Sequence, residues 1–600
     1  MKLNLPVFLI KVIVIVLAAY SLVSSCAKVS SPSGGPRDRE PPVVIKSNPP
    51  DGSVNFRGNR IEITFNEYVV LDRINEKFMV SPPMAERPRI YIRRKNVNIE
   101  YSDALRDTTT YTFYFQDAIR DLNEGNAINN FQFVFSTGPV IDSLSVTGQV
   151  YNAFNLEVPE NTLVLLYKQQ EDSAVIKQLP DYITRAEPEG TFRIDNVRGG
   201  VYRLYAVKDL DNSKNYNLPD EEFAFHETPI EVTPEKNHLP KVKAPVPVAP
   251  GDEKISVQAP PEGEYSLILF GPERKRRFLT SSSRRAPYQM IFTLSLPPDS
   301  MKFEFSIPED PDNSFLIETT RHRDTVTVWL TDSSFYNRQQ IRAVINYPFT
   351  DSAGIDTYRT DSLTMRYLQP RAPRTAPKRT PLRVVPGISS GQLKPGSPVV
   401  FRSETPLAEP DTSKMSLFEL KDSGREQIAF DLSGDSLNLG RYVLKADFRH
   451  GANYLFVARA MAFTDIFGNY SDSTGTRFQV RTPESYGMLS LNVINHEGCR
   501  IIQLLDRDEK LVREVAMENG GRVDFPLLER GFYRLRAIFD LNCDGKWTTG
   551  DFASRRQPEP VSYYPGEIEV KVNWSLEQDW DLERKNFKDH LLRKRSGTRR

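Results

Sequence analysis

The sequence predicts an all-β protein made of several small sandwiches in a row. Apolar and polar residues alternate in runs such as Arg60–Phe65 and Thr110–Phe115, which places the apolar side chains on one face of a strand. Clusters of Pro, Asp, Asn and Gly separate these runs, and the 44 prolines suit loops and linkers better than helices. Because the chain has 600 residues and no long helical periodicity, we expect roughly four to six β domains.

The charge balance excludes one broad class of function. Lys and Arg total 78, and Asp and Glu also total 78, so the formal net charge is zero. A nucleic-acid-binding protein would show a basic field, so we expect no nucleic-acid partner.

The N-terminus predicts a secreted, lipid-anchored protein. Lys2 opens a short basic region, which a second lysine, Lys11, interrupts. The apolar stretch Val12–Ala19 that follows is too short to span a membrane. Val23–Cys26 then resembles a lipobox, the motif at which a bacterial signal peptide is cut and the cysteine is acylated. The resemblance implies a signal peptide over residues 1–25, palmitate or a related acyl chain on Cys26, and attachment to a membrane.

The residues after the cysteine predict a tether and a destination. Residues 26–41 are rich in Ser, Gly and Pro, which is typical of a flexible tether. Ala27 stands where an inner-membrane retention signal would carry Asp, so the resemblance implies an outer-membrane lipoprotein of the cell envelope. The first acid is Asp38, whereas surface-exported lipoproteins of Bacteroidetes usually carry acids directly after the cysteine. We therefore expect the protein to face the periplasm, with exposure at the cell surface as the alternative.

Residues 42–138 resemble the bacterial Ig-like domain of the S-layer (SbsA-like) type. The resemblance depends on Asn48–Gly52, Ile61–Glu67, Thr108–Phe113 and Asp121–Asn126. It implies a structural β-sandwich without catalysis.

A second kind of module follows, and the pair then repeats. Residues 141–235 resemble a transthyretin-like or carboxypeptidase-regulatory-like sandwich, on Ser145–Val150, Gly190–Ile194 and Gly200–Val207. Gly531–Ile538 echoes Gly200–Val207 almost residue for residue, and Thr464–Tyr470 echoes the end of the first Ig-like module. We therefore expect a divergent second Ig-like domain over 387–482 and a second transthyretin-like sandwich over 486–575.

The remaining segments are a middle domain, linkers and a tail. Residues 250–369 form a β-rich block of unassigned family, and Pro-rich linkers lie at 240–261 and, with basic character, at 370–386. Residues 576–600 are expected to form a basic tail, in which Glu583–Arg600 carries eight Lys and Arg against Glu583 and Asp589. Such a tail either contacts anionic lipid or another acidic surface, or stays solvated.

One loop has the spacing of a calcium site. In the twelve residues from Asp540, oxygen ligands fall at loop positions 1, 3, 5, 7, 9 and 12, with Gly545 at position 6 where the backbone turns sharply. The candidate ligands are Asp540, Asn542, Asp544, Lys546 through its carbonyl, Thr548 and Asp551. The site would bind structural Ca²⁺. The alternative is a polar turn whose side chains cap backbone amides without metal.

The first copy of this module has a weaker version of the loop. Its polar residues are in register but Lys214 replaces the glycine, so we expect it to bind calcium weakly or not at all. The positions in register are Asp209, Asp211, Ser213, Asn217 and Asp220.

Cysteines and catalytic patterns are few. Cys499 and Cys543 lie in the last module and either pair or stay as buried free thiols.

Gly387–Gly391 matches a nucleophile elbow but follows a Pro-rich linker, so we expect a loop. The six histidines are scattered without metal-ligand spacing. We therefore expect no enzyme.

Asp followed by Ser or Thr and then by a small or aliphatic residue (Ala, Val, Leu, Met or Thr) recurs nine times, against roughly two or three expected from average composition. The pattern resembles the O-glycosylation sequon of Bacteroidetes, and turn formation explains it equally well. The sites begin at Asp107, Asp142, Asp172, Asp299, Asp324, Asp351, Asp361, Asp435 and Asp472.

These observations favour a non-enzymatic scaffold or binding arm that presents surfaces to an envelope protein or a glycan. The alternative is a glycan-binding lipoprotein of a polysaccharide-uptake system, with Tyr563, Tyr564, Trp574 and Trp580 as candidate platform residues. A hydrolase site in the middle block is a third, less favoured possibility.

Overall fold

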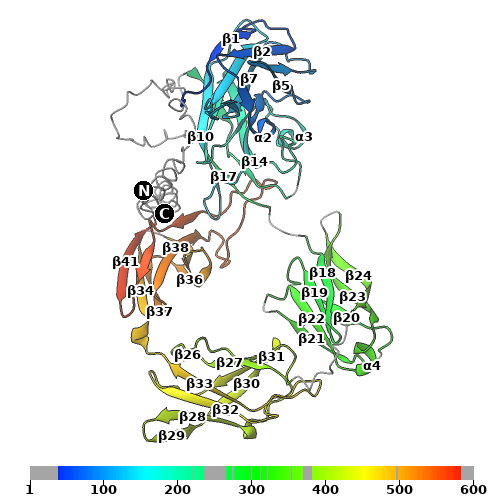
Figure 1. Ribbon diagram of the computed structural model, residues 1–600, viewed down its shortest axis with the longest axis vertical. Coiled ribbons are helices and arrows are strands. Elements are labelled where there is room, and N and C mark those ends of the chain that lie inside the picture. Colours follow the sequence, from blue (N-terminus) through cyan, green and yellow to red (C-terminus); the bar gives the residue numbers. More distant parts are fainter. Residues whose placement is uncertain are drawn as a thin grey trace, which may run out of the picture. The chain divides into compact units, whose positions relative to one another are not determined.

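The computed structural model describes residues 38–582 apart from 219, 235–264, 273–275, 299–300, 311, 321, 353–354, 369–380 and 495–496. The signal segment, the 240–261 linker, most of the 370–386 linker and the tail from Glu583 lie outside the described residues. The described chain consists of mostly antiparallel strands with a few one-turn helices (Figure 1). The all-β prediction is confirmed.

The chain divides into two compact units. Unit 1 contains residues 1–150, 160–217 and 225–267, and unit 2 contains residues 151–159, 218–224 and 268–600. The modules below are taken in chain order.

The first module is a sandwich with a phenylalanine-rich core. Its sheets have the strand orders β1-β2-β6-β5, β4-β7-β9 and β3-β8. Ile61, Ile63 and Phe65 alternate with polar residues along β2 and are fully buried, as the period of two predicts. The elements are β1 (Val44–Asn48), β2 (Arg60–Phe65), β3 (Val69–Leu71), α2 (Ile74–Lys77), β4 (Met79–Ser81), β5 (Arg89–Arg93), β6 (Asn96–Glu100), β7 (Thr110–Gln116), β8 (Ile119–Asp121) and β9 (Phe131–Ser136).

The second module has two sheets, β13-β10-β17 and β12-β11-β14-β15, with β16 also paired to β14. Gly148 in β10 is required by close packing, because a Cβ there would lie 2.2 Å from the Tyr265 carbonyl oxygen. The elements are β10 (Leu144–Asn152), β11 (Thr162–Tyr167), α3 (Ala174–Lys177), β12 (Tyr182–Arg185), β13 (Thr191–Val197), β14 (Gly200–Lys208), β15 (Phe223–Phe225), β16 (Ile230–Val232) and β17 (Tyr265–Leu269).

The middle block is also a sandwich, with sheets β18-β19-β22-β21 and β20-β23-β24 around a core that includes Phe292 and Ile345. The elements are β18 (Leu279–Ala286), β19 (Gln289–Leu294), β20 (Glu304–Ser306), β21 (Phe315–Thr319), β22 (Thr325–Leu330), α4 (Ser333–Tyr336), β23 (Gln340–Thr350) and β24 (Asp356–Arg366).

The fourth module has sheets β25-β27-β31-β30 and β26-β33-β32-β28-β29, with Phe401, Tyr454 and Phe456 in its core. The elements are β25 (Val384–Pro386), β26 (Gln392–Leu393), β27 (Val399–Ser403), η2 (Thr412–Lys414), β28 (Met415–Lys421), β29 (Gly424–Ile428), β30 (Asp431–Asp435), β31 (Asn438–Lys445), β32 (Asn453–Ala458) and β33 (Thr474–Val480).

The last module has sheets β37-β34-β41 and β36-β35-β38-β39, with β40 also paired to β38. Its elements are η3 (Pro483–Ser485), β34 (Gly487–Ile494), β35 (Cys499–Leu505), β36 (Leu511–Glu518), β37 (Gly521–Leu528), β38 (Gly531–Phe539), β39 (Val561–Tyr563), β40 (Ile568–Val570) and β41 (Ser575–Asp581).

The second and last modules repeat one fold strand for strand. Their sheets have the same order, and β14 and β38 have the same succession of buried and exposed residues. A tyrosine near the start of each strand donates a hydrogen bond to the carbonyl four residues earlier, from Tyr202 to Arg198 at 2.8 Å and from Tyr533 to Glu529 at 2.8 Å. The sequence echo therefore reflects a shared three-dimensional arrangement.

Two segments lie in other sheets than their place in the sequence suggested. Residues 265–269 were expected in the middle block, but they form β17 beside β10 in the second module. Residues 576–581 were expected in the basic tail, but they belong to β41, which runs parallel to β34 and carries the buried Trp580. Both strands pair with partners far away in the sequence, which local pattern does not reveal.

Candidate functional site

The predicted lipidation site, Cys26, lies outside the described residues. Among the residues that the structure does describe, no helix has the length and apolar character needed to cross a membrane.

The predicted calcium loop begins where β38 ends. Asp540 is 3% exposed, and its two carboxylate oxygens accept hydrogen bonds from the Asp544 amide at 3.1 Å and the Gly545 amide at 2.8 Å. Gly545 has φ +76°, the left-handed conformation that glycine adopts without strain. The turn that the spacing predicts is therefore present.

The structure brings four predicted ligands together in this turn. The Asn542 side chain accepts from the Asp544 amide at 3.0 Å and donates to the Thr548 hydroxyl at 3.0 Å. The Asp544 carboxylate accepts from the Lys546 amide at 2.8 Å, so Lys546 contributes its backbone to the same turn. These bonds also fit a turn without metal, and they gather side-chain oxygens in one place.

The residue predicted to close the loop makes contacts further along the chain. The Asp551 carboxylate accepts from the Ala553 amide at 3.1 Å and from the Ser554 hydroxyl at 2.7 Å. Glu559, which the sequence analysis missed, instead reaches back into the loop. It is 5% exposed, and its oxygens accept from the Leu541 and Thr548 amides, both at 2.8 Å.

The loop of the first copy follows the same backbone path although it lacks the glycine. Lys214 takes a left-handed φ of +62° in place of Gly545, and the Asp209 carboxylate accepts from the Ser213 and Lys214 amides at 3.2 and 3.0 Å. Burial raises the pKa of Asp209, whereas hydrogen bonds from Asn217 and Ser213 lower the pKa of Asp211 to about 2.

Two carboxylates of this first-copy loop form a group with a third one just after it. Asp209, Asp211 and Glu221 offer oxygens within 4.8 Å of one another, and the described residues show no other such group of three acidic, His or Cys side chains. Glu221 lies two residues before β15, as Glu559 lies two residues before β39. Aligning the two repeats by their strands would have revealed both glutamates.

A disulfide anchors the last module's loop. Cys543, at loop position 4, is bonded to Cys499 at the start of β35, with 5.5 Å between the Cα atoms. The sequence was compatible with a disulfide and with two free thiols, and the structure contains the disulfide.

Within unit 2, residues 151–159 pack beside the same loop. The rings of Phe154 and Trp547 have centroids 4.9 Å apart, and the Arg536 guanidinium lies 4.0 Å from the Phe154 ring centroid. Leu156 is 2% exposed and belongs to a core cluster with Ile501 and Tyr563. The loop is thus supported by packing as well as by the disulfide.

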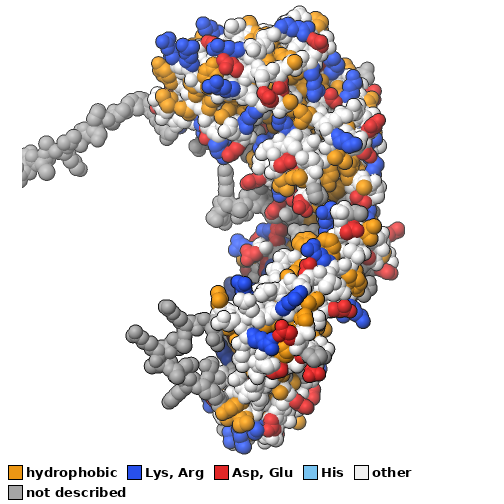
Figure 2. Space-filling model, turned by 90° about the vertical axis from the view of Figure 1, so that its right-hand side faces the viewer, with side chains coloured by type: hydrophobic (Ala, Val, Ile, Leu, Met, Phe, Trp, Pro, Cys, Tyr) orange, Lys and Arg blue, Asp and Glu red, His pale blue; other side chains and the backbone are white. Residues whose placement is uncertain are grey.

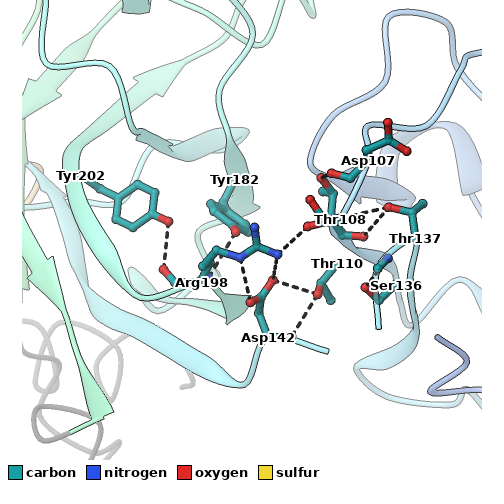
Figure 3. A network of polar contacts seen from close by, with 11 residues as sticks. Asp107, Thr108, Thr110, Ser136, Thr137, Asp142, Tyr182, Arg198 and Tyr202 are labelled. Atoms are coloured by element: carbon teal, nitrogen blue, oxygen red, sulfur yellow. Dashed lines mark hydrogen bonds and ion pairs between the residues drawn. The ribbon is translucent and has the colours of Figure 1, made fainter. Parts of the chain in front are cut away.

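A polar network joins the first two modules inside unit 1 (Figure 3). The Arg198 guanidinium, on the turn between β13 and β14, pairs with both carboxylate oxygens of Asp142 at 3.1 and 3.3 Å. It also donates to the Thr108 carbonyl of the Ig-like module. Asp142 in turn accepts from the Thr110 hydroxyl at 2.9 Å, and the Tyr182 hydroxyl accepts from the Arg198 amide at 3.2 Å.

Two further hydrogen bonds cross this joint, and the first of them is buried. The Ile183 amide donates to the Ser81 hydroxyl at 3.1 Å, and the Asn196 side chain donates to the Thr112 hydroxyl at 2.9 Å. Hydrogen bonding to Asp142 raises the pKa of Arg198, which favours the charged guanidinium. Sequence analysis noted Asp142 only as a possible glycosylation motif, because its partner lies 56 residues away.

The remaining predicted sites have structural roles. Tyr563 and Trp580 are buried at 4% exposure, and the Tyr564 hydroxyl donates to the Gln578 side chain at 2.7 Å. Trp574 is 55% exposed, and the Lys571 ammonium lies 4.8 Å from its ring centroid. Gly387–Gly391 lies in a turn with no helix after it, and this is not a nucleophile elbow.

Comparison with known proteins identifies one domain. Residues 38–137 match the bacterial Ig-like domain family. A search of curated proteins returned no match.

Solved structures with similarity include the S-layer protein rSbsC(31-844), at 9% identity over 85% of this chain and 67% of that chain, with a TM-score of 0.13. The MG0-NIE-MG1 domains of Escherichia coli alpha-2-macroglobulin align at 12% identity over 50% of this chain and 98% of theirs, with a TM-score of 0.17. The Bacillus anthracis TIE protein aligns at 9% identity over 94% and 78%, with a TM-score of 0.13. Similarities this low carry no functional argument.

Proposed function

We propose that this chain is a cell-envelope lipoprotein, anchored through Cys26, that acts as a non-enzymatic scaffold or binding arm. The lipobox-like Val23–Cys26 supports the anchor, with the outer membrane as the destination that Ala27 implies. The Ig-like domain at residues 38–137 supports a structural role. The partner is an envelope protein or a glycan.

One observation carries the proposal, the joint around Arg198 and Asp142. Flexible linkers let neighbouring domains move, whereas this joint ties the first two modules by a charged fork and several hydrogen bonds. A stiff pair of modules directly after a tether is what an arm needs, because it keeps the surfaces of the two modules in one fixed arrangement.

Replacing Arg198 with alanine is expected to loosen this joint. Asp142, whose side chain is 13% exposed, would lose its charged partner at a cost of about 1 kcal/mol, allowing for the exposure of Arg198. Hydrogen exchange of the full chain should then be about fivefold faster around Thr108–Thr110, with unchanged exchange in the last module.

A matched control is Arg522→Ala, which removes an ion pair with Asp524 in the last module. It should leave exchange at Thr108–Thr110 unchanged. Equal exchange at these residues in wild type and Arg198→Ala would mean that the Arg198–Asp142 pair does not hold the two modules together, and the proposed arm would lose the observation that carries it.

We also propose that the loop from Asp540 binds Ca²⁺ as a structural ion. Asp540 and Glu559 are both buried, and neither makes an ion pair with any Lys, Arg or His that the structure describes. Buried carboxylates without a cation are costly, and oxygen-rich turns are the ligands that calcium prefers. Asp540, Asn542, Asp544, Thr548 and the Lys546 carbonyl would hold the ion, with Glu559 or the originally predicted Asp551 as the closing acid.

Calcium is therefore expected to raise the melting temperature of the last module. An ion at one hundred times its Kd stabilises the folded state by about 2.7 kcal/mol. The measurement is thermal melting of the full chain in millimolar calcium and in EDTA, followed by tryptophan fluorescence, since Trp547 lies inside the loop.

Variants separate the two closing acids. Asp540→Ala with Asp544→Ala should abolish the calcium response. Glu559→Gln should reduce it if Glu559 is the closing ligand, whereas Asp551→Asn should reduce it if Asp551 is. Equal melting of wild type in calcium and EDTA would leave only the metal-free turn.

A further inference from the structure

The outer face of one sheet in the first module collects positive charge. Sheet β1-β2-β6-β5 turns Ile61, Ile63, Val97 and Ile99 toward the core, all at 0% exposure. The residues between them point the other way, because side chains alternate along a strand. We call this opposite side, together with the β5–β6 turn, the basic face.

Strand register fixes which side chains share the basic face. Lys46, Thr64, Asn96 and Arg93 form one row across the four strands. Asn48, Glu62, Asn98 and Tyr91 form the next, and Arg60, Glu100 and Arg89 form the third. Arg94 and Lys95 follow in the β5–β6 turn. Six cations less two carboxylates give the face a net charge of +4, although the whole chain is neutral.

The two carboxylates on the face already have partners. Glu100 accepts from the Tyr91 hydroxyl at 2.8 Å and lies 3.8 Å from Arg60. Glu62 accepts from the Asn96 side chain at 2.5 Å and lies 3.5 Å from Arg60. One arginine thus neutralises much of the negative charge, and the other cations remain available.

The other cations make no ion pair with a carboxylate that the structure describes. Arg89, Arg93 and Arg94 are exposed, and the Arg89 guanidinium lies 5.3 Å from the Tyr91 ring centroid. The Lys95 ammonium donates to the Asn66 carbonyl at 2.6 Å and lies 5.5 Å from the centroid of Tyr68, which is 55% exposed. The face therefore combines free guanidinium groups with tyrosines, and in Figure 2 blue side chains gather at the top of the view, where Figure 1 draws β1, β2 and β5.

Guanidinium forks bind phosphate oxygens in pairs, and tyrosine rings suit the boundary between water and lipid. The first module also follows the proposed anchor closely. From Cys26 to Val44 the chain has 18 residues, which reach at most about 60 Å when extended. A protein acylated at Cys26 keeps this module within that distance of a bilayer.

We propose that the basic face binds the phosphate headgroups of an anionic lipid bilayer. The identity of the partner rests on the proposed anchor at Cys26, whereas the charge and geometry of the face do not. Acylation would supply one contact with the membrane and the basic face a second.

The test uses the chain from residue 26 onward with Cys26→Ala, so that no acyl chain takes part. Sedimentation with vesicles of phosphatidylcholine, with and without phosphatidylglycerol, measures partition onto the lipid. We expect binding to the anionic vesicles, little binding to the neutral ones, and loss of binding at high salt.

Arg89→Glu with Arg93→Glu and Arg94→Glu should weaken binding at least about tenfold. The matched control is Arg402→Glu with Arg459→Glu and Arg477→Glu, which reverses three exposed arginines of the fourth module and changes the net charge equally. It should change binding less than about twofold. Glutamine at positions 89, 93 and 94 should give an intermediate loss, and a melting curve for each variant establishes that it folds.

The basic tail from Glu583 is the main competitor, so each protein is measured with and without residues 583–600. If deletion of the tail abolishes binding and the three Arg→Glu changes do not, the tail is the contact and the proposal is wrong. An equal loss of vesicle binding in the control variant would mean that only the net charge of the protein matters, and this result would also overturn the proposal. Membrane attachment of Cys26→Ala in cells that persists at high salt would count against the anchor, and the vesicle result would stand independently.

Discussion

Cys26→Ala is expected to remove acyl labelling and to move the protein from the membrane fraction to the soluble fraction. Cys26 is the predicted acylation site, and no described helix is able to span a membrane. Each buried methylene of an acyl chain contributes about 0.8 kcal/mol, so loss of the chains removes most of the binding energy. Incorporation of labelled palmitate and fractionation in high salt measure the two effects, because salt screens any contact made by the basic face.

The control for this experiment is already in the chain. Cys543→Ser removes another cysteine and should leave labelling and sedimentation unchanged. A Cys26→Ala protein that still incorporates palmitate and still sediments at high salt would show that the lipobox interpretation is wrong.

Removing the disulfide is expected to destabilise the last module by about 4 kcal/mol. Cys499 and Cys543 are 44 residues apart, and closing a loop of that size restricts the unfolded chain by about this amount. Denaturant unfolding followed by tryptophan fluorescence measures the effect, because Trp547, Trp574 and Trp580 all lie in this module or its last strand.

The double variant Cys499→Ser, Cys543→Ser should unfold at a lower denaturant concentration than the wild type. Reductant should shift the wild type to the same midpoint and leave the double variant unchanged. A wild type that shows two free thiols and no response to reductant would mean that the bond does not form, and the loop from Asp540 would then be held by Glu559 and packing alone. Disulfides persist in oxidising compartments, so formation of this bond also supports a location outside the cytoplasm.

Local pattern predicted the strands but not all of their partners. Arg60–Phe65 was predictable because an amphipathic strand buries every second residue whatever pairs with it. The membership of β17 and β41 depends on pairing with β10 and β34, and nothing in Tyr265–Leu269 itself names that partner. Sheet membership is a long-range property, and sequence periodicity is a short-range one.

The candidate site divides in the same way. Asp540, Asn542, Asp544 and Gly545 were predictable because one turn determines their spacing. Glu559 lies outside the twelve-residue window, and its carboxylate accepts hydrogen bonds from the turn. Asp551 makes its contacts elsewhere, because the chain bends again between Asp551 and Arg556. Arg198 and Asp142 meet through the packing of two modules, which no motif encodes.

The packing of Leu156 has a consequence for the time course of folding. This side chain is buried against residues that include Ile501 and Tyr563, and 563 − 156 places the last of them 407 residues later in the chain. At roughly 5–20 residues per second, ribosomes need about 20–80 s to make that stretch. Until these residues of the final module are made, Leu156 and Phe154 lack the side chains with which they pack, so an apolar loop that is made early stays exposed and prone to aggregation.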